Sequence, residues 1–291
     1  MPTLVVDGHN LAFRTLYAIP NLGGEGESTQ VLMGFLRSIA SYLRLFGKSS
    51  PVDVVVAWDS GNGRRKALDP AYKANRGSHT HTSSWLDRVK EVLPLLGVKQ
   101  ITAPGEEADD VVCSYLARLG KEASPIIVVT RDADYLQLVS DTVTVAVPEK
   151  KGVTLLFDPE RVLQEYGVTP SQIPALKALT GDVSDNIVGI PRFPTKVAAS
   201  LLRDYGTLSG VYQSGFPGLT RKQYEGLKAQ ETKVKSNLIL TTMVSSLEPR
   251  EETPTPDKAK ASEILSSLGF TRIETYVDPF FPPRQGFLKF G

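Results

Sequence analysis

The chain has 291 residues, in which 33 lysines and arginines nearly balance 32 aspartates and glutamates, so the formal charge is only +1. This balance excludes a protein whose binding depends on a polybasic arm or an acidic tail. Hydrophobic residues make up 41% of the chain and charged residues 22%, an ordinary globular composition that excludes disordered, collagen-like and coiled-coil chains. The length corresponds to about two domains of roughly 150 residues each.

The expected location is the cytoplasm. The single cysteine, Cys113, cannot form an internal disulfide, so nothing favours an oxidising compartment. The amino-terminal sequence lacks the basic region of a signal peptide, and its apolar run is interrupted at Asp7. No stretch approaches the roughly 20 apolar residues of a membrane span, so we expect no membrane partner.

Strand and helix patterns alternate along the first half of the chain. In chain order, the predicted elements are a strand at Leu4–Val6, a helix at Gln30–Leu45, a strand at Val52–Ala57, a helix at Ser84–Leu96, a helix at Ala108–Leu119 and a strand at Ile126–Thr130. The strands are almost continuously apolar, as strands covered on both faces are. The pattern predicts an α/β fold with a parallel sheet and flanking helices.

Carboxylates follow each predicted strand. Asp7 follows the first, Asp59 the second, and Asp132 and Asp134 the third. The acidic segment that opens the helix at 108–119 adds Glu107, Asp109 and Asp110. Because ligands bind at the carboxyl ends of parallel strands, we expect these side chains to meet at one edge of the sheet.

Each of these carboxylates has a structural alternative. Acidic residues in a first helical turn are favoured by the helix dipole, and Asp7 or Asp59 alone could form a turn. The convergence of so many carboxylates favours a functional site over these structural roles, because unit charges about 4 Å apart repel by roughly 4 kcal/mol at a surface-like dielectric. The cluster therefore predicts protonated acids or bound metal ions.

A second acidic pair, Asp182 and Asp185, has the i, i+3 spacing that places both side chains on one side of a helical turn. The alternative is a solvated loop with Asx turns. Oxygen ligands favour Mg²⁺ or Mn²⁺. The three histidines, His9, His79 and His81, have no metal-ligand spacing with a cysteine, which argues against zinc.

The near-zero total charge hides a segregation of charge along the chain. Residues 61–100 carry eight basic and three acidic residues, residues 101–140 three basic and seven acidic, and residues 186–240 eight basic and three acidic. Two basic zones thus flank the acidic one. A polyanion lying across the acidic site would meet positive charge on both sides.

Two short segments combine features suited to a nucleic acid. Tyr72, Lys73 and Arg76 offer an aromatic face for a base and two phosphate contacts; a solvated basic helix is the alternative. Residues 189–196 (GIPRFPTK) predict a tight hairpin between helical patterns at Ile173–Leu179 and Val197–Leu202. Amides of such a turn can face a phosphate, although a plain turn needs no ligand. The expected DNA-binding residues there are Gly189, Ile190, Arg192 and Lys196.

Six ordered motifs carry a family resemblance. VVDGHN, AWDSG, YKANRG, GEEADD, TRDADYLQL and GDVSDNIVGIP, between Leu4 and Leu247, resemble the 5′-nuclease (flap endonuclease) family. The likeness is to the 5′-nuclease domain of bacterial DNA polymerase I and to stand-alone bacteriophage 5′-exonucleases. No polymerase-like segment follows, so a stand-alone enzyme is expected, acting as a monomer in a bacterial cell or a virus-infected host cell.

The resemblance implies a PIN-like (resolvase-like) nuclease core at residues 1–170, with a gateway region at about 73–96. A helix-hairpin-helix (H3TH) region is implied at 171–268, and a Pro/Phe-rich tail at 269–291. The family hairpin usually has glycines where this chain has Arg192 and Pro194. Pro194 has no backbone amide to donate, which argues against the family's usual phosphate contact and K⁺ site at this hairpin. The positive charge of Arg192 could hold the phosphate instead.

The resemblance also implies residue roles. The first metal group is Asp7, Asp59, Glu107 and Asp109, with Asp110 in support, and the second is Asp132, Asp134, Asp182 and Asp185. The residues expected at the scissile region are Arg14, Arg65, Lys73 and Arg76, with Tyr72 stacked on a base.

The implied function is metal-dependent cleavage of DNA at a 5′ flap, nick or single-strand/double-strand junction, with two Mg²⁺ or Mn²⁺ ions and with RNA-primer removal as a further activity. Two alternatives are a PIN-type ribonuclease, which would not need the hairpin, and a non-catalytic junction-binding protein, which would not need both metal groups.

The carboxyl-terminal segment Asp278–Gly291 contains three prolines and four phenylalanines, too apolar for a free tail and too proline-rich for a helix. It follows a predicted helix at Ala261–Leu268. Docking on the chain's own core is one interpretation. The other is a sliding-clamp peptide anchored by Gln285, Leu288 and Phe290, which resembles that of cellular flap endonucleases.

Overall fold

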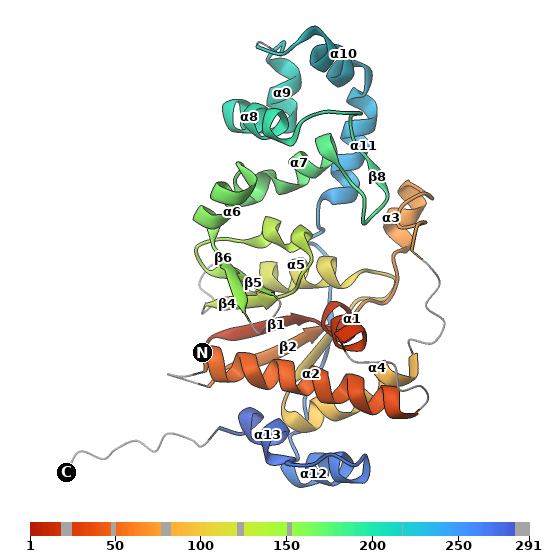
Figure 1. Cartoon of the computed structure of the whole chain (residues 1–291), viewed down its shortest axis with the longest axis vertical. Coiled ribbons are helices and arrows are strands. Elements are labelled where there is room, and N and C mark those ends of the chain that lie inside the picture. Colours follow the sequence, from red (N-terminus) through yellow and green to blue (C-terminus); the bar gives the residue numbers. More distant parts are fainter. Residues whose placement is uncertain are drawn as a thin grey trace, which may run out of the picture.

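The computed structural model describes residues 1–18, 25–47, 51–76, 83–120, 125–149, 153–216 and 218–282. Its described strands form a seven-stranded sheet with the order β6-β5-β4-β1-β2-β3-β9 (Figure 1). These strands are β1 Thr3–Asp7, β2 Asp53–Ala57, β3 Lys99–Thr102, β4 Ile126–Val129, β5 Val143–Pro148, β6 Thr154–Phe157 and β9 Arg250–Glu252. The five central strands are parallel, and β6 and β9 add antiparallel edges.

The predicted strands are present and are buried on both faces. Leu4, Val5 and Val6 of β1 are all 0% exposed. Leu4 and Val6 belong to the hydrophobic cluster that contains α1 (Gly8–Ala18), α2 (Glu25–Phe46) and α4 (Ser83–Val92), whereas Val5 belongs to the cluster that contains α5 (Ala108–Leu119). Alternate residues of one strand thus pack against opposite helical layers, which explains the continuous apolar sequence.

The helices predicted in the first half of the chain agree with the structure except at one end. The bounds of α5 are those expected, and α2 contains the expected range. The helix expected at Ser84–Leu96 changes at Leu93 into a 3-10 helix, η1 (Leu93–Leu96), which has Pro94 in its first turn. Proline lacks the amide needed to continue the α-helical hydrogen bonds, which accounts for the change.

A helical region rises above the sheet (Figure 1). Its helices are α6 Pro159–Tyr166, α7 Ile173–Thr180, α8 Thr195–Tyr205, α9 Leu208–Gln213, α10 Arg221–Ala229 and α11 Glu231–Thr241. The hairpin expected at 189–196 does not join α7 directly to α8. Strands β7 (Gly181–Asp182) and β8 (Ile187–Val188) lie between them. A Cβ atom on Gly189 would lie 2.2 Å from the Gly181 nitrogen, so only a glycine lets the two strands close there.

The chain returns to the sheet earlier than the expected boundary at residue 268. β9 pairs with β3; α12 (Lys258–Ser267) then packs against η1 and α13 (Glu274–Val277) against α2. The helix expected at Ala261–Leu268 starts one turn sooner because Asp257 caps it. Residues 250–282 therefore belong to the nuclease layer in packing terms, and not to the helical region.

Part of the tail docks on the chain's own core, as one interpretation expected. Phe280 and Phe281 pack against the cluster that contains α2. Gln285, Leu288 and Phe290, the expected clamp anchors, lie outside the described residues, so the clamp remains a prediction. None of the helices in the described part of the chain has the length and apolar character that a bilayer crossing requires.

Gly8, the first residue of α1, tests how tightly that helix packs on β2. A Cβ atom there would lie 2.5 Å from two ring carbons of Trp58, and this ring is 1% exposed and fixed by a 2.8 Å bond from its Nε1 to Gln100. We expect Gly8→Ala to lower the unfolding free energy by about 1–3 kcal/mol, as overpacking does. Gly63→Ala is the control, since its nearest atom would be 4.0 Å away. Equal denaturation midpoints for the two variants would contradict the close packing.

Candidate active site

A cleft of about 440 Å³ lies at the carboxyl ends of β1, β2 and β4. Carboxylates and cations both line it. The acidic lining residues are Asp7, Asp59, Glu107, Asp109 and Asp132, and the basic ones are Arg14, Lys73, Arg76 and Arg131. The expected convergence of strand-end carboxylates at one edge of the sheet is therefore present.

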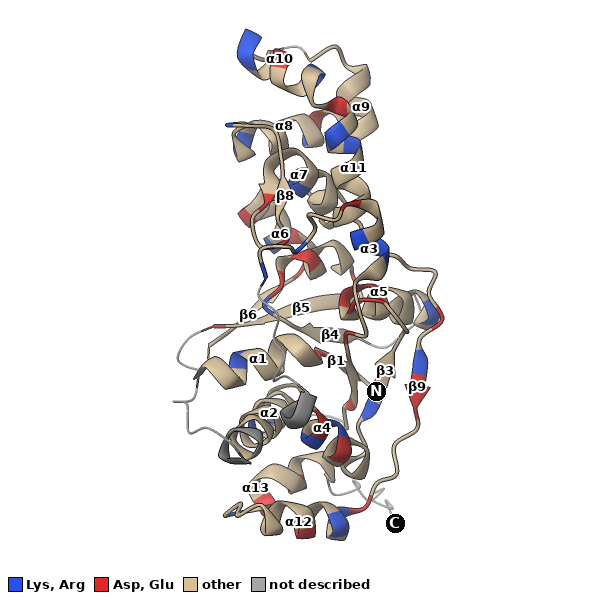
Figure 2. Cartoon of the chain, turned by 90° about the vertical axis from the view of Figure 1, so that its right-hand side faces the viewer, with Lys and Arg blue, Asp and Glu red and all other residues tan. Residues whose placement is uncertain are grey.

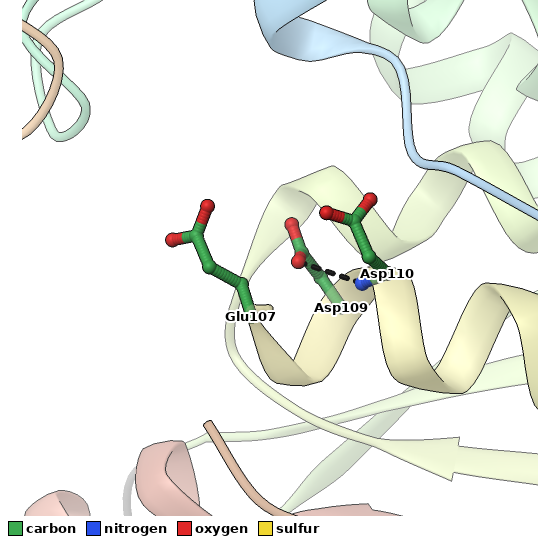
Figure 3. A group of neighbouring side chains, drawn as sticks. All are labelled: Glu107, Asp109 and Asp110. Atoms are coloured by element: carbon green, nitrogen blue, oxygen red, sulfur yellow. Dashed lines mark hydrogen bonds between the residues drawn. The ribbon is translucent and has the colours of Figure 1, made fainter. Parts of the chain in front are cut away.

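The acidic residues Glu107, Asp109 and Asp110 project from the start of α5 (Figure 3). Glu107 and Asp109 line the cleft, and one oxygen from each of Glu107, Asp109 and Asp110 lies within 4.8 Å of the others. Asp110 is 0% exposed, and its Oδ1 accepts hydrogen bonds from Arg65 at 3.0 Å and from the Val244 amide at 2.7 Å. Asp110 is thus held in a supporting position behind the cleft.

Asp7 and Asp59 serve as caps and still line the cleft. Asp7 Oδ1 accepts from the Asn10 amide at 3.0 Å at the start of α1. Asp59 Oδ1 accepts from the Ala108 amide at 2.7 Å at the start of α5. In each carboxylate one oxygen caps a helix and the other does not. Capping by Asp7 or Asp59 is therefore compatible with the metal-binding interpretation of the same side chain.

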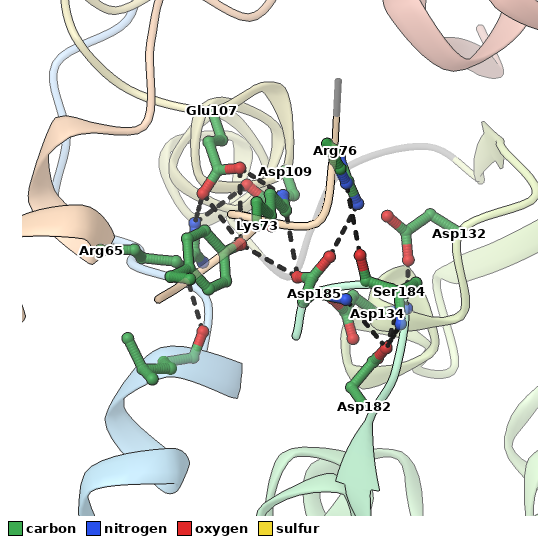
Figure 4. A network of polar contacts seen from close by, with 12 residues as sticks. Arg65, Lys73, Arg76, Glu107, Asp109, Asp132, Asp134, Asp182, Ser184 and Asp185 are labelled. Atoms are coloured by element: carbon green, nitrogen blue, oxygen red, sulfur yellow. Dashed lines mark hydrogen bonds and ion pairs between the residues drawn. The ribbon is translucent and has the colours of Figure 1, made fainter. Parts of the chain in front are cut away.

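The second acidic group comes from two regions of the chain (Figure 4). Asp132 and Asp134 follow β4, and Asp182 and Asp185 lie in the β7–β8 hairpin. The last two are not on a helical turn as expected. Asp182 Oδ1 instead accepts a hydrogen bond from the Ser184 amide at 2.8 Å, which is an Asx turn. The local geometry is therefore that of a loop with an Asx turn, the alternative to the helical turn.

Cations lie between these carboxylates. Lys73 pairs with Glu107 and lies 3.7 Å from Asp185, and Arg76 Nη2 binds Asp185 at 2.7 Å (Figure 4). Lys73 has a left-handed backbone, with φ of 53°. The turn that carries Lys73 and Arg76, the basic turn, thus bridges the acidic residues of α5 and those of the β7–β8 hairpin.

Arg65 does not reach the cleft, contrary to expectation. Its side chain is 2% exposed, and its guanidinium binds Glu107 at 2.6 Å, Asp110 at 2.7 Å and the Leu240 carbonyl at 2.9 Å. In this conformation the guanidinium is enclosed by protein groups. Arg65 therefore ties α3 (Gly63–Leu68), α5 and α11 together beneath the site.

Tyr72 also differs from expectation in this conformation. It is 1% exposed, and its hydroxyl hydrogen-bonds to Glu107 at 3.1 Å and to Asp185 at 3.0 Å. Lys73 Nζ lies 4.9 Å from its ring centroid. The ring is therefore covered and offers no face to a base, and its role here is to join the two acidic groups.

The pKa values divide the carboxyls into two kinds. Burial and the neighbouring Asp59 raise the pKa of Asp7 to about 7, and burial and Asp132 raise that of Asp134 to about 7. Burial alone would raise the pKa of Glu107, but Lys73 and Arg65 outweigh it and hold that pKa below its usual value. Burial thus dominates the pKa of Asp7 and of Asp134, the latter even beside Lys177, whereas two cations dominate that of Glu107.

The hairpin after β8 keeps its turn without the family's glycines. Arg192 has a left-handed backbone, with φ of 56°, and both Arg192 and Lys196 are exposed. Ile190 is buried, and its amide donates to the Leu179 carbonyl at 2.8 Å. Contrary to expectation, this amide is therefore not available to a phosphate. The exposed side chains of Arg192 and Lys196 are available for a phosphate contact at the turn.

Sequence reasoning missed Lys177 as a site residue. Lys177 lies on α7 and pairs with Asp134, and also with Asp182 at 2.8 Å. These ion pairs raise its pKa despite burial. The signal was present, since Lys177 is the only charged residue in the apolar helix sequence IPALKALT. His9, whose Nδ1 accepts from the Asp59 amide at 3.0 Å, was also missed as a neighbour of a site residue.

Comparison with known proteins agrees with this geometry. Residues 2–167 match the family model of the 5′-3′ exonuclease amino-terminal, resolvase-like domain, and residues 168–261 match its carboxyl-terminal SAM fold. The chain belongs to the 5′-3′ exonuclease family, which confirms the family and fold expected from the sequence. The expected division near residue 170 lies close to the division between the two family models.

Curated relatives include longer polymerases. The chain is 38% identical to DNA polymerase I of Mycobacterium bovis over 261 residues, which are 87% of this chain and 28% of that protein. It is 36% identical to the thermostable DNA polymerase I of Thermus filiformis, over 72% of this chain and 25% of that protein. The chain thus spans about a quarter of the length of these relatives.

Solved structures share the fold. The bacteriophage T5 5′-exonuclease with bound zinc has a TM-score of 0.65 at 20% identity, covering 97% of this chain and 98% of that one. Flap endonuclease-1 from Methanococcus jannaschii has a TM-score of 0.60 at 17% identity, covering 96% and 91%. At these identities the likeness concerns the fold alone.

Arg65 provides a test of the tie beneath the site. Arg65→Met should lower the unfolding free energy by about 3–5 kcal/mol, because it leaves buried carboxylates without their cation. Arg64→Met is the control, since the Arg64 side chain is 28% exposed and Asp110 keeps its bonds to Arg65. The Arg64→Met variant should lose about 1 kcal/mol of unfolding free energy or less. Urea denaturation measures both. If Arg65→Met kept its stability but lost DNA affinity, Arg65 would be a substrate contact after all.

The raised pKa values of Asp7 and Asp134 predict a pH dependence in EDTA. Their folded pKa of about 7 exceeds the unfolded value near 4, so the native state binds these protons more tightly. The stability they contribute is complete below pH 4 and is lost as the pH rises through 7. The melting temperature should therefore fall between pH 5 and 8, and less so in Asp7→Asn. A melting temperature that rises steadily over this window would contradict the assignment.

Proposed function

We propose that this member of the 5′-3′ exonuclease family hydrolyses DNA phosphodiester bonds near 5′ ends, flaps or junctions. The observation that carries the proposal is the meeting of two carboxylate groups, from β1, β2, α5, the end of β4 and the β7–β8 hairpin, beside a cleft with basic walls. Figure 2 shows acidic residues around the start of α5 and basic residues on α3, α8 and α10. A phosphate backbone crossing the cleft would meet both.

The donor set fits two divalent cations. Every candidate ligand is a carboxylate oxygen, which suits Mg²⁺ or Mn²⁺. The proposed ligands are Asp7, Asp59, Glu107 and Asp109 for one ion and Asp132, Asp134, Asp182 and Asp185 for the other. Ions held there would supply an activated water and charge stabilisation at the leaving 3′ oxygen.

The chain's own cations have separate tasks in this proposal. Lys73 and Arg76, now paired with Glu107 and Asp185, would turn to the phosphoryl oxygens and offset their developing charge. Arg14 and Arg131 would hold flanking phosphates at the cleft. Arg192 and Lys196, exposed on the helical region, would contact the duplex backbone. A K⁺ ion at this turn and the removal of RNA primers remain predictions.

Cleavage of defined substrates tests the function. In Mg²⁺ the chain should cleave a 5′-labelled flap and a nicked duplex, leave a 5′-phosphate and a 3′-hydroxyl, and stop in EDTA; an RNA-primed duplex tests primer removal. Asp182→Asn and Asp185→Asn should lower turnover roughly a hundredfold, as loss of several kcal/mol of charge stabilisation implies, with little loss of DNA affinity. Asp141→Asn, at an exposed position elsewhere, is the matched control.

Two outcomes would overturn the proposal. Cleavage of single-stranded RNA without preference for a DNA junction would indicate a PIN-type ribonuclease. Tight junction binding without cleavage in Mg²⁺ or Mn²⁺ would indicate a non-catalytic binding protein.

A further inference from the structure

Tyr135 carries an unpaired hydroxyl at the wall of the cleft. It lies in η2 (Ala133–Leu138), directly after Asp134, and it is 0% exposed. Among the described residues, its hydroxyl is the only buried side-chain polar atom that makes no hydrogen bond. The same residue lines the cleft beside Asp7 and Asp109.

Packing does not explain the hydroxyl. The ring belongs to the hydrophobic cluster between the sheet and α5, where a phenylalanine would fill the same space. A buried hydroxyl without a partner costs about 1–3 kcal/mol, and nearly all such groups in native proteins find a partner or an ordered water. A partner is therefore to be sought in the cleft that Tyr135 lines.

The surroundings of the hydroxyl indicate the kind of partner. The phenol of Tyr135 can donate one hydrogen bond, and Asp7, Asp59, Asp109 and Asp132 line the same cleft. By ordinary hydrogen-bond geometry, the hydroxyl has no partner among these carboxylates. It thus faces the first carboxylate group without being used by it.

We propose that Tyr135 is a positioning residue for the divalent-cation site of Asp7, Asp59, Glu107 and Asp109, where its hydroxyl hydrogen-bonds to a water in the coordination shell of the ion. The inference rests on the proposed function, because it assumes that an ion binds there. Mg²⁺ keeps several of its waters in protein sites, and groups that bind the ligands of an ion commonly strengthen its binding by 10- to 100-fold.

Tyr135→Phe removes only the hydroxyl oxygen. Titration calorimetry without DNA should show Mg²⁺ affinity falling by about tenfold or more. Ca²⁺ affinity should fall less, because Ca²⁺ more readily replaces waters by protein oxygens. In EDTA the melting temperature should stay the same or rise, since an unpaired buried hydroxyl is lost. A residue with a purely structural role would instead lower the melting temperature in EDTA and leave ion affinity alone.

Two further measurements sharpen the test. Tyr115→Phe is the matched control, because Tyr115 is a buried tyrosine of α5 in the same cluster but outside the lining of the cleft; its Mg²⁺ affinity should equal that of the unaltered chain. In flap cleavage, Tyr135→Phe should need about tenfold more Mg²⁺ for half-maximal rate, with the KM for DNA unchanged.

The results separate this inference from the proposed function. If the unaltered chain binds Mg²⁺ and Tyr135→Phe binds it equally well, only the role of Tyr135 is wrong. If the unaltered chain binds no Mg²⁺, the metal site and this inference both fail. A lower melting temperature of Tyr135→Phe in EDTA, with Mg²⁺ affinity retained, would assign the hydroxyl to packing and overturn the inference.

Discussion

The crowding of negative charge at one edge of a parallel sheet is the constraint on which this structure depends. Strands of the sheet end in Asp7 and in the segments that carry Asp59 and Asp132, and other acidic residues of the site are paired with cations: Glu107 with Arg65 and Lys73, and Asp134 with Lys177. Each of these cations comes from a different element. Charge compensation therefore fixes where α3, the basic turn and α7 lie, because a buried carboxylate must be paired or protonated.

Much of the fold could be predicted because its strands are buried on both faces. Leu4–Val6 and Ile126–Thr130 are recognisable as continuous apolar runs, and their carboxyl ends locate the acidic residues of the site. The β7–β8 hairpin was not predicted, because two-residue strands have no periodicity and the closure depends on the close approach of Gly181 and Gly189. The return of β9 was not predicted either, since its polar sequence Arg-Glu-Glu gives no strand signal; all three of its residues are exposed.

The sequence predicted which residue types form the site better than it predicted which way their side chains point. Sequence motifs identify Arg65 and Tyr72 as site residues, but both side chains are buried in the structure, and no local sequence pattern predicts the burial of a cation or a phenol. Lys177 became evident only when α7 was seen to face Asp134. The capping and ligand interpretations of Asp7 and Asp59 were offered as alternatives, yet one carboxylate has enough oxygens for both.

The position of Lys177 has a mechanical consequence. Its ammonium group sits on the helical region, while Asp134 belongs to the sheet region, so an ion pair inside the site also fastens the two regions to each other. Arg65 does the same between α5 and the carbonyl of Leu240 at the end of α11. Interdomain rigidity and assembly of the site are thus one cooperative property, and any ligand that draws these charges apart changes the stiffness of the joint.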